Sequence, residues 1–298
     1  MEFVERTVPL EGGEIGIVAW PAPRAGAPVL HFAHGTGLCG RAYQRLLAPL
    51  AARFEVVAWD ARGHGRTTLP ADPATLVDWR PYVEDLAALI ARVSPGRPAF
   101  LMGHSLGGIT SLEMAAARPD LAAAVLVLEP PLVPESEIEW LEGLRAKGET
   151  RPIETQMQER AGRRRAHFPD RATAAESWRG KGAFATWPDA WLDDFVAGGL
   201  LPDDERGGFR LACPPAWEGK TYHAVSTNFW RSLARLERPA TIMHGDRNSP
   251  VSAESVASID RIGRARRVPV PGATHFLPVE FPDLVRAEAM RLADEAGL

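Results

Sequence analysis

The stretch Met-Gly-His-Ser-Leu-Gly-Gly at residues 102–108 limits the possible folds more than any other feature of this chain. It directly follows the apolar run at residues 98–101 and leads into a segment, residues 106–117, that fits a helix. Small residues on both sides of Ser105 suit a sharp turn from a strand into a helix, which would lift the serine hydroxyl above the edge of a sheet. Ser105 is therefore a candidate nucleophile, provided that the rest of the chain supplies a base, an acid and an oxyanion site.

Strand and helix patterns alternate along most of the chain, which is typical of a largely parallel sheet wrapped by helices. An antiparallel hairpin is predicted first, from residues 3–8 and 14–20 joined at Gly12-Gly13. Six buried strands are predicted to follow, at residues 29–33, 54–59, 99–102, 121–128, 240–244 and 265–270. Helices are predicted at residues 42–52, 79–93, 106–117, 253–259 and 282–296. The fold class is therefore α/β, with a mostly parallel eight-stranded sheet and flanking helices.

The alternation stops after the sixth strand, where about a hundred residues pass without a convincing strand. Six of the nine tryptophans of the chain lie there: Trp140, Trp178, Trp187, Trp191, Trp217 and Trp230. We expect a mostly helical cap at residues 130–238, inserted into a core domain made of residues 1–129 and 239–298. Its tryptophans would form a small core of their own or line an apolar substrate pocket.

Composition argues against several classes of function. The net charge of −4 gives no basic footprint for nucleic acid. The longest apolar run, residues 121–128, is far shorter than the ~18 to 20 residues of a membrane span, and no signal peptide is visible at the N-terminus. Two cysteines make no disulfide scaffold, and metal-ligand and nucleotide-binding spacings are missing. We expect a cytoplasmic protein without cofactor, nucleic-acid partner or membrane span, and its oligomeric state stays open.

The base and the oxyanion site are predicted from two loops. A serine must be activated by an adjacent base, and His275 stands in the loop between the last strand and the last helix. The glycine-rich turn at residues 34–37 leaves the strand at 29–33. The backbone N–H groups of Thr36 and Leu106 are predicted to hold an oxyanion. The strand-borne histidines are expected to pack or support the site: His31, His104 and His244.

Four motifs, "HGTG", "DARGHGRT", "GHSLGG" and "GATHF", occur in this order and together resemble those of the α/β-hydrolase family. The resemblance covers the whole chain except the inserted segment, which is similar to the variable cap that this family places after its sixth strand. It implies an α/β-hydrolase fold and a serine hydrolase in which Ser105 and His275 carry the chemistry. It says much less about the substrate.

The resemblance also implies a place for the acid, and there this sequence departs from the usual pattern. The usual place is the loop after the strand at 240–244, where Asn248 stands instead of a carboxylate. Some members carry the acid at the end of the sixth strand, and Glu129 occupies that position here. A glutamate there is costly to bury unless a partner such as a cationic His275 faces it. Glu129 is preferred over Asp246, and a dyad or an inactive site is the third possibility.

The predicted function is hydrolysis of a carboxylic ester or related acyl compound through an acyl-enzyme, by a triad of Ser105, His275 and Glu129. The tryptophan-rich insertion suggests a small apolar acyl or ester-type substrate. Dehalogenation and epoxide hydrolysis are disfavoured because their nucleophile is a carboxylate. Hydrolysis of carbon–carbon bonds, thioesters or lactones, and cofactor-free perhydrolysis, remain alternatives. A ligand-binding protein without useful turnover is a further alternative, because an amide, Asn248, stands at the usual position of the acid.

Overall fold

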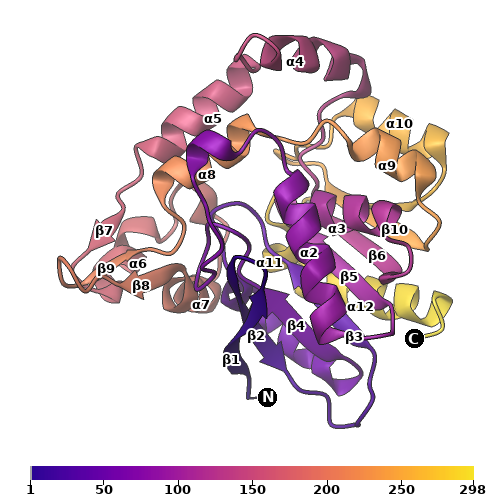
Figure 1. The fold of residues 1–298 in the computed structure, drawn as a ribbon, viewed down its shortest axis with the longest axis horizontal. Coiled ribbons are helices and arrows are strands. Elements are labelled where there is room, and N and C mark those ends of the chain that lie inside the picture. The colour runs from indigo at the N-terminus through magenta and orange to yellow at the C-terminus, as the bar shows by residue number, and fades with distance from the viewer. Residues whose placement is uncertain (1) are drawn as a thin grey trace.

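The computed structural model describes residues 2–298, which are arranged around one large sheet (Figure 1). Its eight strands lie in the order β1-β2-β4-β3-β5-β6-β10-β11. Their bounds are Val4–Leu10 (β1), Gly13–Trp20 (β2), Val29–Ala33 (β3), Glu55–Trp59 (β4), Ala99–His104 (β5), Ala122–Leu128 (β6), Ala240–Gly245 (β10) and Arg266–Val270 (β11). β2 pairs antiparallel with β1 and β4, and all other neighbours are parallel. The predicted mostly parallel, eight-stranded α/β architecture is confirmed.

The central strands bring their carboxyl ends to one edge of the sheet. Every residue of β3 and β5 is buried, as expected of parallel strands covered on both faces. The register pairs Ala33 with Gly103 and His104 with Leu128, so β3, β5 and β6 end side by side. The loops that follow these strands therefore meet at one place.

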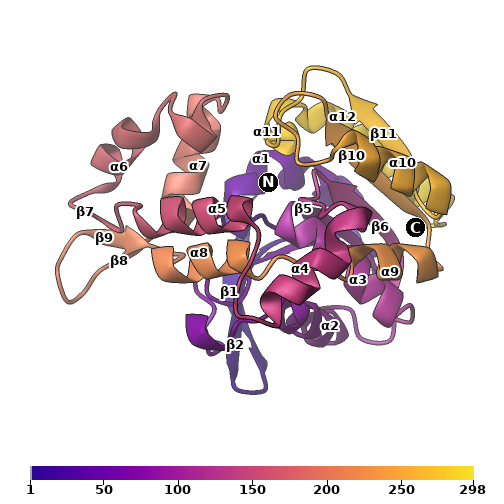
Figure 2. The same cartoon turned by 90° about the horizontal axis from the view of Figure 1, so that it is seen from above.

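Helices cover both faces of the sheet and enclose two hydrophobic cores. One face carries α2 (Arg80–Val93), α3 (Leu106–Ala117), α9 (Phe229–Arg235) and α10 (Ala253–Ile262). The other carries α1 (Gln44–Leu47), α11 (Leu277–Glu280) and α12 (Pro282–Glu295). Figure 2 shows α2 and α12 on opposite sides of the sheet. The buried residues of α2 recur at helical spacing on one face: Tyr82, Leu86, Leu89 and Ile90.

The helix predicted at residues 42–52 is instead a chain of three short pieces. These are the 3₁₀ turn η1 (Gly40–Tyr43), α1 and the 3₁₀ turn η2 (Ala48–Ala52). Pro49 lies at the start of η2 and has no N–H to donate to the preceding turn, so a continuous α-helix cannot pass it. Three further 3₁₀ turns occur elsewhere: η3 (Pro73–Thr75), η4 (Glu135–Glu137) and η5 (Gly182–Phe184).

The segment between β6 and β10 is mostly helical, as predicted, but it also contains strands. Its helices before α9 are α4 (Ile138–Arg145), α5 (Pro152–Gly162), α6 (Arg171–Trp178), α7 (Asp189–Gly199) and α8 (Pro215–His223). Its strands β7 (His167–Phe168), β8 (Leu200–Pro202) and β9 (Phe209–Leu211) form a separate antiparallel sheet in the order β7-β9-β8. The sequence shows no convincing strand there because strands of two or three residues are too short to show an alternating pattern.

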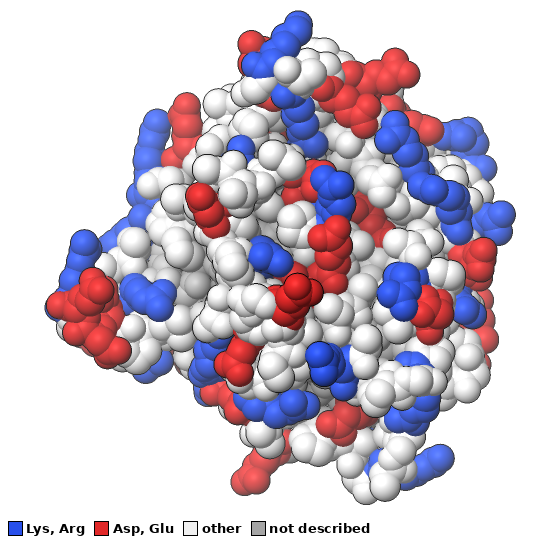
Figure 3. Space-filling model, viewed as in Figure 1, with Lys and Arg blue, Asp and Glu red and all other residues white. Residues whose placement is uncertain are grey.

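The surface shows no preference for one sign of charge on the face seen in Figure 3, where acidic and basic side chains are interspersed. Within residues 2–298, no helix combines the length and the apolar character that a membrane span requires.

Candidate active site

Ser105 lies in a strained turn between β5 and α3. Its backbone has φ 56° and ψ −122°, a region that residues other than glycine rarely occupy. A Cβ on Gly103 would lie 2.3 Å from the Gly107 carbonyl oxygen, and a Cβ on Gly107 would lie 2.1 Å from that of Ala33. The two glycines are therefore needed for the turn to pack against itself and against β3.

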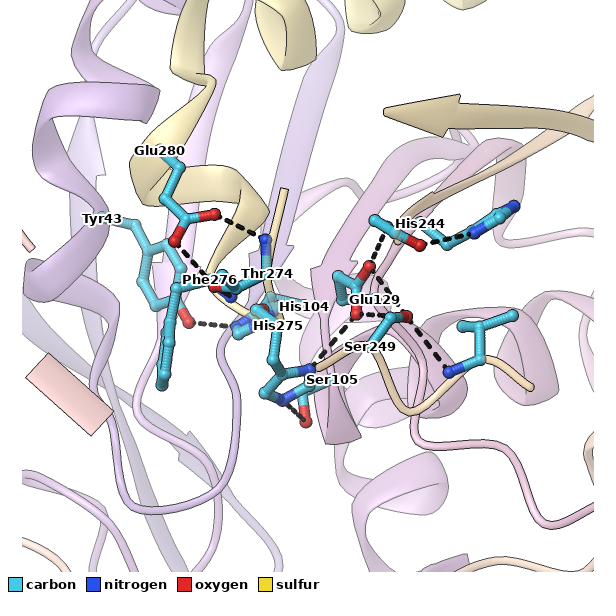
Figure 4. Close-up of polar contacts among 12 residues, drawn as sticks. Tyr43, His104, Ser105, Glu129, His244, Ser249, Thr274, His275, Phe276 and Glu280 are labelled. Carbon is cyan, nitrogen blue, oxygen red and sulfur yellow. Dashed lines mark hydrogen bonds and ion pairs between the residues drawn. The ribbon is translucent and has the colours of Figure 1, made fainter. Parts of the chain in front are cut away.

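His275 faces Ser105 from the loop between β11 and α11. Its Nε2 lies 3.2 Å from Ser105 Oγ, within reach of a hydrogen bond (Figure 4). The loop is held by Glu280, whose carboxylate accepts bonds from the Thr274 N–H at 2.7 Å and the Thr274 hydroxyl at 2.6 Å. The Phe276 N–H donates in turn to Thr274 Oγ1 at 3.1 Å. The ring of His275 thus projects from a braced turn.

Glu129 lies on the other side of the imidazole. It is fully buried, directly follows β6 and has a positive φ of 51°. Its Oε2 is 3.5 Å from His275 Nδ1, within ion-pair range, although Nδ1 makes no hydrogen bond to any described residue. Hydrogen bonds in active sites are often long until substrate or transition state is bound. The structure thus brings together Ser105, His275 and Glu129.

The end of β10 and the loop after it hold the Glu129 carboxylate in place. The Gly245 N–H donates to Oε1, and the Ser249 hydroxyl lies 3.0 Å from Oε2. Ser249 Oγ itself accepts from the Val251 N–H at 3.1 Å, which leaves its proton for the carboxylate. Ser249 carries no motif of its own, and sequence reasoning did not identify it.

Two further residues bear on the acid: Asp246, the alternative candidate, and Asn248, which stands at the usual acid position. The Asp246 carboxylate accepts a bond from the Gly272 N–H at 2.8 Å, in an exposed loop. Asn248 is exposed and has a left-handed φ of 50°. Neither has a polar contact with His275 in residues 2–298.

The predicted oxyanion donors are available. The N–H groups of Thr36 and Leu106 have no hydrogen-bond acceptor among the residues that the structure describes.

Two histidines join the Thr36 turn to the loop at residues 60–67, each by accepting a hydrogen bond from a backbone N–H of the other segment. The Gly37 N–H donates to His64 Nε2 at 3.0 Å, and the Ala61 N–H donates to His34 Nε2 at 2.9 Å.

Both of these histidines must be neutral to accept such bonds. Each uses its other ring nitrogen to donate to a backbone carbonyl, His34 to Gly35 at 2.8 Å and His64 to Arg62 at 3.0 Å. Burial lowers the pKa of His34 to about 4 and that of His64 to about 3. The turn that carries Thr36 is therefore fixed by two uncharged imidazoles at neutral pH.

Helix α8 of the insertion sits directly on these two loops. Trp217 donates from Nε1 to the Arg62 carbonyl at 3.0 Å, and a Cβ on Gly63 would lie only 2.1 Å from that nitrogen. Glu218, which pairs with Arg164, would lie 2.7 Å from a Cβ on Gly37. Such contacts between distant segments left no signal in the sequence.

An aromatic cluster of the insertion reaches the histidine loop. Its ring centroids lie 5.0 to 6.1 Å apart and belong to Phe168, Trp178, Phe184, Trp187 and Phe195. Trp187 packs edge-on against Phe276 at 5.4 Å. These tryptophans are therefore part of a core that borders the site.

Two other kinds of reactive site would be a metal-ligand cluster and an activated thiol. Residues 2–298 contain no group of three or more His, Cys, Asp or Glu side chains arranged to hold a metal ion. Burial raises the pKa of both thiols, Cys39 and Cys213, so neither is an activated nucleophile.

Two named hydrolases and one crystal structure are similar to this chain over most of its length. 2-(Acetamidomethylene)succinate hydrolase of Mesorhizobium japonicum is 28% identical over 95% of this chain and 92% of its own. Lipase LipV of Mycobacterium tuberculosis is 28% identical over 85% of this chain and 88% of its own. The crystal structure of E-2-(acetamidomethylene)succinate hydrolase matches 98% of this chain and 100% of that chain, with a TM-score of 0.78 and 26% identity.

The family model described as "Alpha/beta hydrolase family" matches residues 32–288, which include the Ser105 turn, Glu129 and His275. This match spans most of the chain. The chain therefore belongs to the alpha/beta hydrolase family.

Proposed function

We propose that the protein hydrolyses a carboxylic ester or a related acyl compound through an acyl-enzyme on Ser105. The observation that carries the proposal is the 3.2 Å separation of Ser105 Oγ and His275 Nε2, with the Glu129 carboxylate on the far side of the same ring. A serine activated by an imidazole that a carboxylate orients is the arrangement of acyl-transfer enzymes.

In the first half of the reaction, His275 Nε2 takes the proton from Ser105 as Oγ attacks the acyl carbonyl. The N–H groups of Thr36 and Leu106 then bind the oxyanion of the tetrahedral intermediate, each contributing about 3 kcal/mol. The buried carboxylate of Glu129 stabilises the imidazolium, because the charges interact more strongly in a dry site than in water. His275 passes its proton to the leaving group as the bond to the acyl carbon breaks.

In the second half, His275 takes a proton from water, and the hydroxide attacks the ester that Ser105 has formed. Collapse of this intermediate returns the proton to Ser105 Oγ and releases the acid. The substrate and one water molecule balance the two halves together.

The substrate is proposed only as a class. The two relatives of 28% identity carry the names of a succinate-derivative hydrolase and a lipase, so this level of similarity spans different substrates. Trp187 lies against Phe276, the residue after His275, and supports an apolar portion next to the reacting acyl group.

Labelling with a fluorophosphonate tests the proposal. The native protein should be modified at one site, located by mass spectrometry at Ser105, and Ser105→Ala should abolish the modification. A panel of p-nitrophenyl esters of increasing acyl length should then show turnover. A native protein that is folded but neither labelled nor active on any ester would point to the ligand-binding alternative.

A further inference from the structure

His104, the residue before Ser105, lies between the histidine loop and the turn that carries Thr36. It ends β5 and is 1% exposed. Its Nε2 lies 2.7 Å from the His275 carbonyl oxygen, and its Nδ1 lies 2.7 Å from the Tyr43 hydroxyl (Figure 4). The ring centroids of His104 and His275 are 4.8 Å apart.

The position of the proton on His104 follows from its partners. A carbonyl oxygen can only accept a hydrogen bond, so Nε2 of His104 carries the proton and donates a hydrogen bond to the His275 carbonyl oxygen. Nδ1 then has a lone pair and accepts from the Tyr43 hydroxyl. The Tyr43 oxygen is in turn 3.5 Å from the Gly35 N–H, which donates to it. One directed chain therefore runs from Gly35 through Tyr43 and His104 to the backbone of His275.

We propose that His104 is a positioning residue, which sets the distance between His275 and Ser105 through the bond from its Nε2–H to the His275 carbonyl. This inference rests on the proposed function. The other bonds that hold this loop act farther from the ring: Glu280 binds Thr274, and the Arg247 N–H donates to the Ala273 carbonyl at 3.0 Å. Among the hydrogen bonds of residues 2–298, only the His104 bond joins the backbone of His275 to the strand that presents the nucleophile.

A neutral imidazole suits this position better than a cation. Burial, followed by the charge of His275, holds the pKa of His104 well below its usual range. His104 therefore stays uncharged while its neighbour takes a proton from Ser105. A lysine or arginine would supply the donor but would place a second positive charge beside the imidazolium.

Three substitutions separate the two bonds of His104. His104→Gln places an amide nitrogen near the position of Nε2 and keeps the donor to His275. His104→Asn places an oxygen near the position of Nδ1 and keeps only the acceptor for Tyr43. His104→Leu removes both. His167→Leu is the matched control, because His167 also lies close to a backbone carbonyl, that of Gly207 at 2.6 Å, but in the insertion.

The readout is the rate of fluorophosphonate labelling at several reagent concentrations, which separates binding of the reagent from bond formation. We expect the bond-forming rate to fall about 10-fold to 100-fold in the Leu and Asn variants, as for a loosely placed base. The apparent affinity for the reagent should stay near that of the native protein. The bond-forming rate of His104→Gln should stay close to native. The control should label like the native protein.

Two results would overturn the inference: Leu and Asn variants that label at the native rate, or a Gln variant that is as slow as Leu. Thermal unfolding of each variant identifies loss of fold. If Leu does not fold, the contrast between Gln and Asn, which are both polar, decides the question. If neither Leu nor Asn folds, a Gln rate below a tenth of native counts against the inference. A native protein that is not labelled at all contradicts the proposed function instead.

Discussion

At the scale of single residues, the proposed acid stands at the end of β6, and the region where the sequence pattern usually places the acid binds its carboxylate instead. Glu129 faces His275 from the end of β6, while Gly245 at the end of β10 and Ser249 in the loop after it donate to that carboxylate. Asn248 is exposed and makes no polar contact with His275 in residues 2–298. This arrangement requires no carboxylate at position 248. The amide at the usual acid position is therefore compatible with an active enzyme.

Glu129→Gln should lower kcat by about 10³-fold to 10⁴-fold, because an amide cannot stabilise the imidazolium and can hold the ring in the wrong tautomer. Asp246→Asn and Asn248→Asp should each change kcat by less than about threefold, since neither side chain reaches His275. Steady-state kinetics on an activated ester measures all three. A collapse for Asp246→Asn alone would assign the acid to that residue and contradict the mechanism.

Ser249→Ala should also lower kcat, but less than Glu129→Gln does. It removes one hydrogen bond to a buried carboxylate, worth about 1.5 to 3 kcal/mol, while the Gly245 N–H still holds the other oxygen. We expect kcat to fall about 10-fold with KM nearly unchanged, since Ser249 acts through Glu129. Ser249→Thr keeps the hydroxyl and should stay closer to native; equal losses in both variants would argue for a packing effect.

The residues that sequence reasoning proposes are those that stand at strand ends within short patterns: Ser105, His275, Glu129 and Thr36. Each was placed separately, and the structure brings the first three within hydrogen-bond or ion-pair range. The proposed positioning role of His104 could not be predicted from a short sequence pattern. Its partners Tyr43 and His275 are 61 and 171 residues away in the chain, and no local spacing encodes such contacts.

At the scale of elements, α8 and the loop at residues 60–67 act as one unit. Trp217 covers Gly63, and the next residue along that loop, His64, accepts the N–H of Gly37. The glycines of "DARGHGRT" are recognisable as a motif in the sequence. The contact with Trp217 of α8, which leaves no room for a side chain at Gly63, is not. The requirement for glycine there comes from packing between Gly63 and Trp217, which are far apart in the chain.

Gly63→Ala should therefore weaken both stability and activity. Gly63 has φ +74°, and the added Cβ would meet the rigid Trp217 indole at 2.1 Å, which must displace α8 or the loop. Gly12→Ala is the matched control, because Gly12 has φ +85° but no atom within 4 Å of the added Cβ. Both variants should lose about 1 kcal/mol from backbone strain. Only Gly63→Ala should lose a further ~1 to 3 kcal/mol from overpacking.

Urea denaturation gives the two free energies of unfolding, and fluorophosphonate labelling gives the activity. Gly63→Ala should label more slowly than the native protein, while Gly12→Ala should label at the native rate. Equal free energies of unfolding for the two variants would show that α8 moves away from Gly63 at no cost, and would contradict the packing requirement at Gly63.

At the scale of the whole molecule, buried neutral histidines make the fold sensitive to acid. Burial lowers the pKa of His31 and His64 to about 3 and that of His34 to about 4, from the ordinary 6.5. Below pH 6.5 the unfolded chain therefore binds protons that the native chain does not. The stability that these groups contribute is complete above pH 6.5. It is lost as the pH falls, toward 4 for His34 and toward 3 for His31 and His64, by about 1.4 kcal/mol per pH unit for each histidine.

His31→Phe tests this account at one site. His31 is fully buried, packs edge-on against Trp59 at 5.4 Å, and neither ring nitrogen has a partner in residues 2–298. Phenylalanine keeps the ring and removes two unsatisfied nitrogens, so the free energy of unfolding at pH 7 should rise by about 1 kcal/mol or more. Between pH 6.5 and 4 its slope against pH should be smaller than native by about 1.4 kcal/mol per unit.

Urea denaturation of both proteins at pH 7, 6 and 5 measures this difference in slope. Burial also raises the pKa of Glu113 to about 7, which works in the opposite direction because the native state binds that proton more tightly. Glu113 is present in both proteins, so its contribution cancels when they are compared. Parallel pH profiles would mean that His31 binds its proton equally well in both states. The acid sensitivity of the fold would then have to come from the histidines that brace the Thr36 turn.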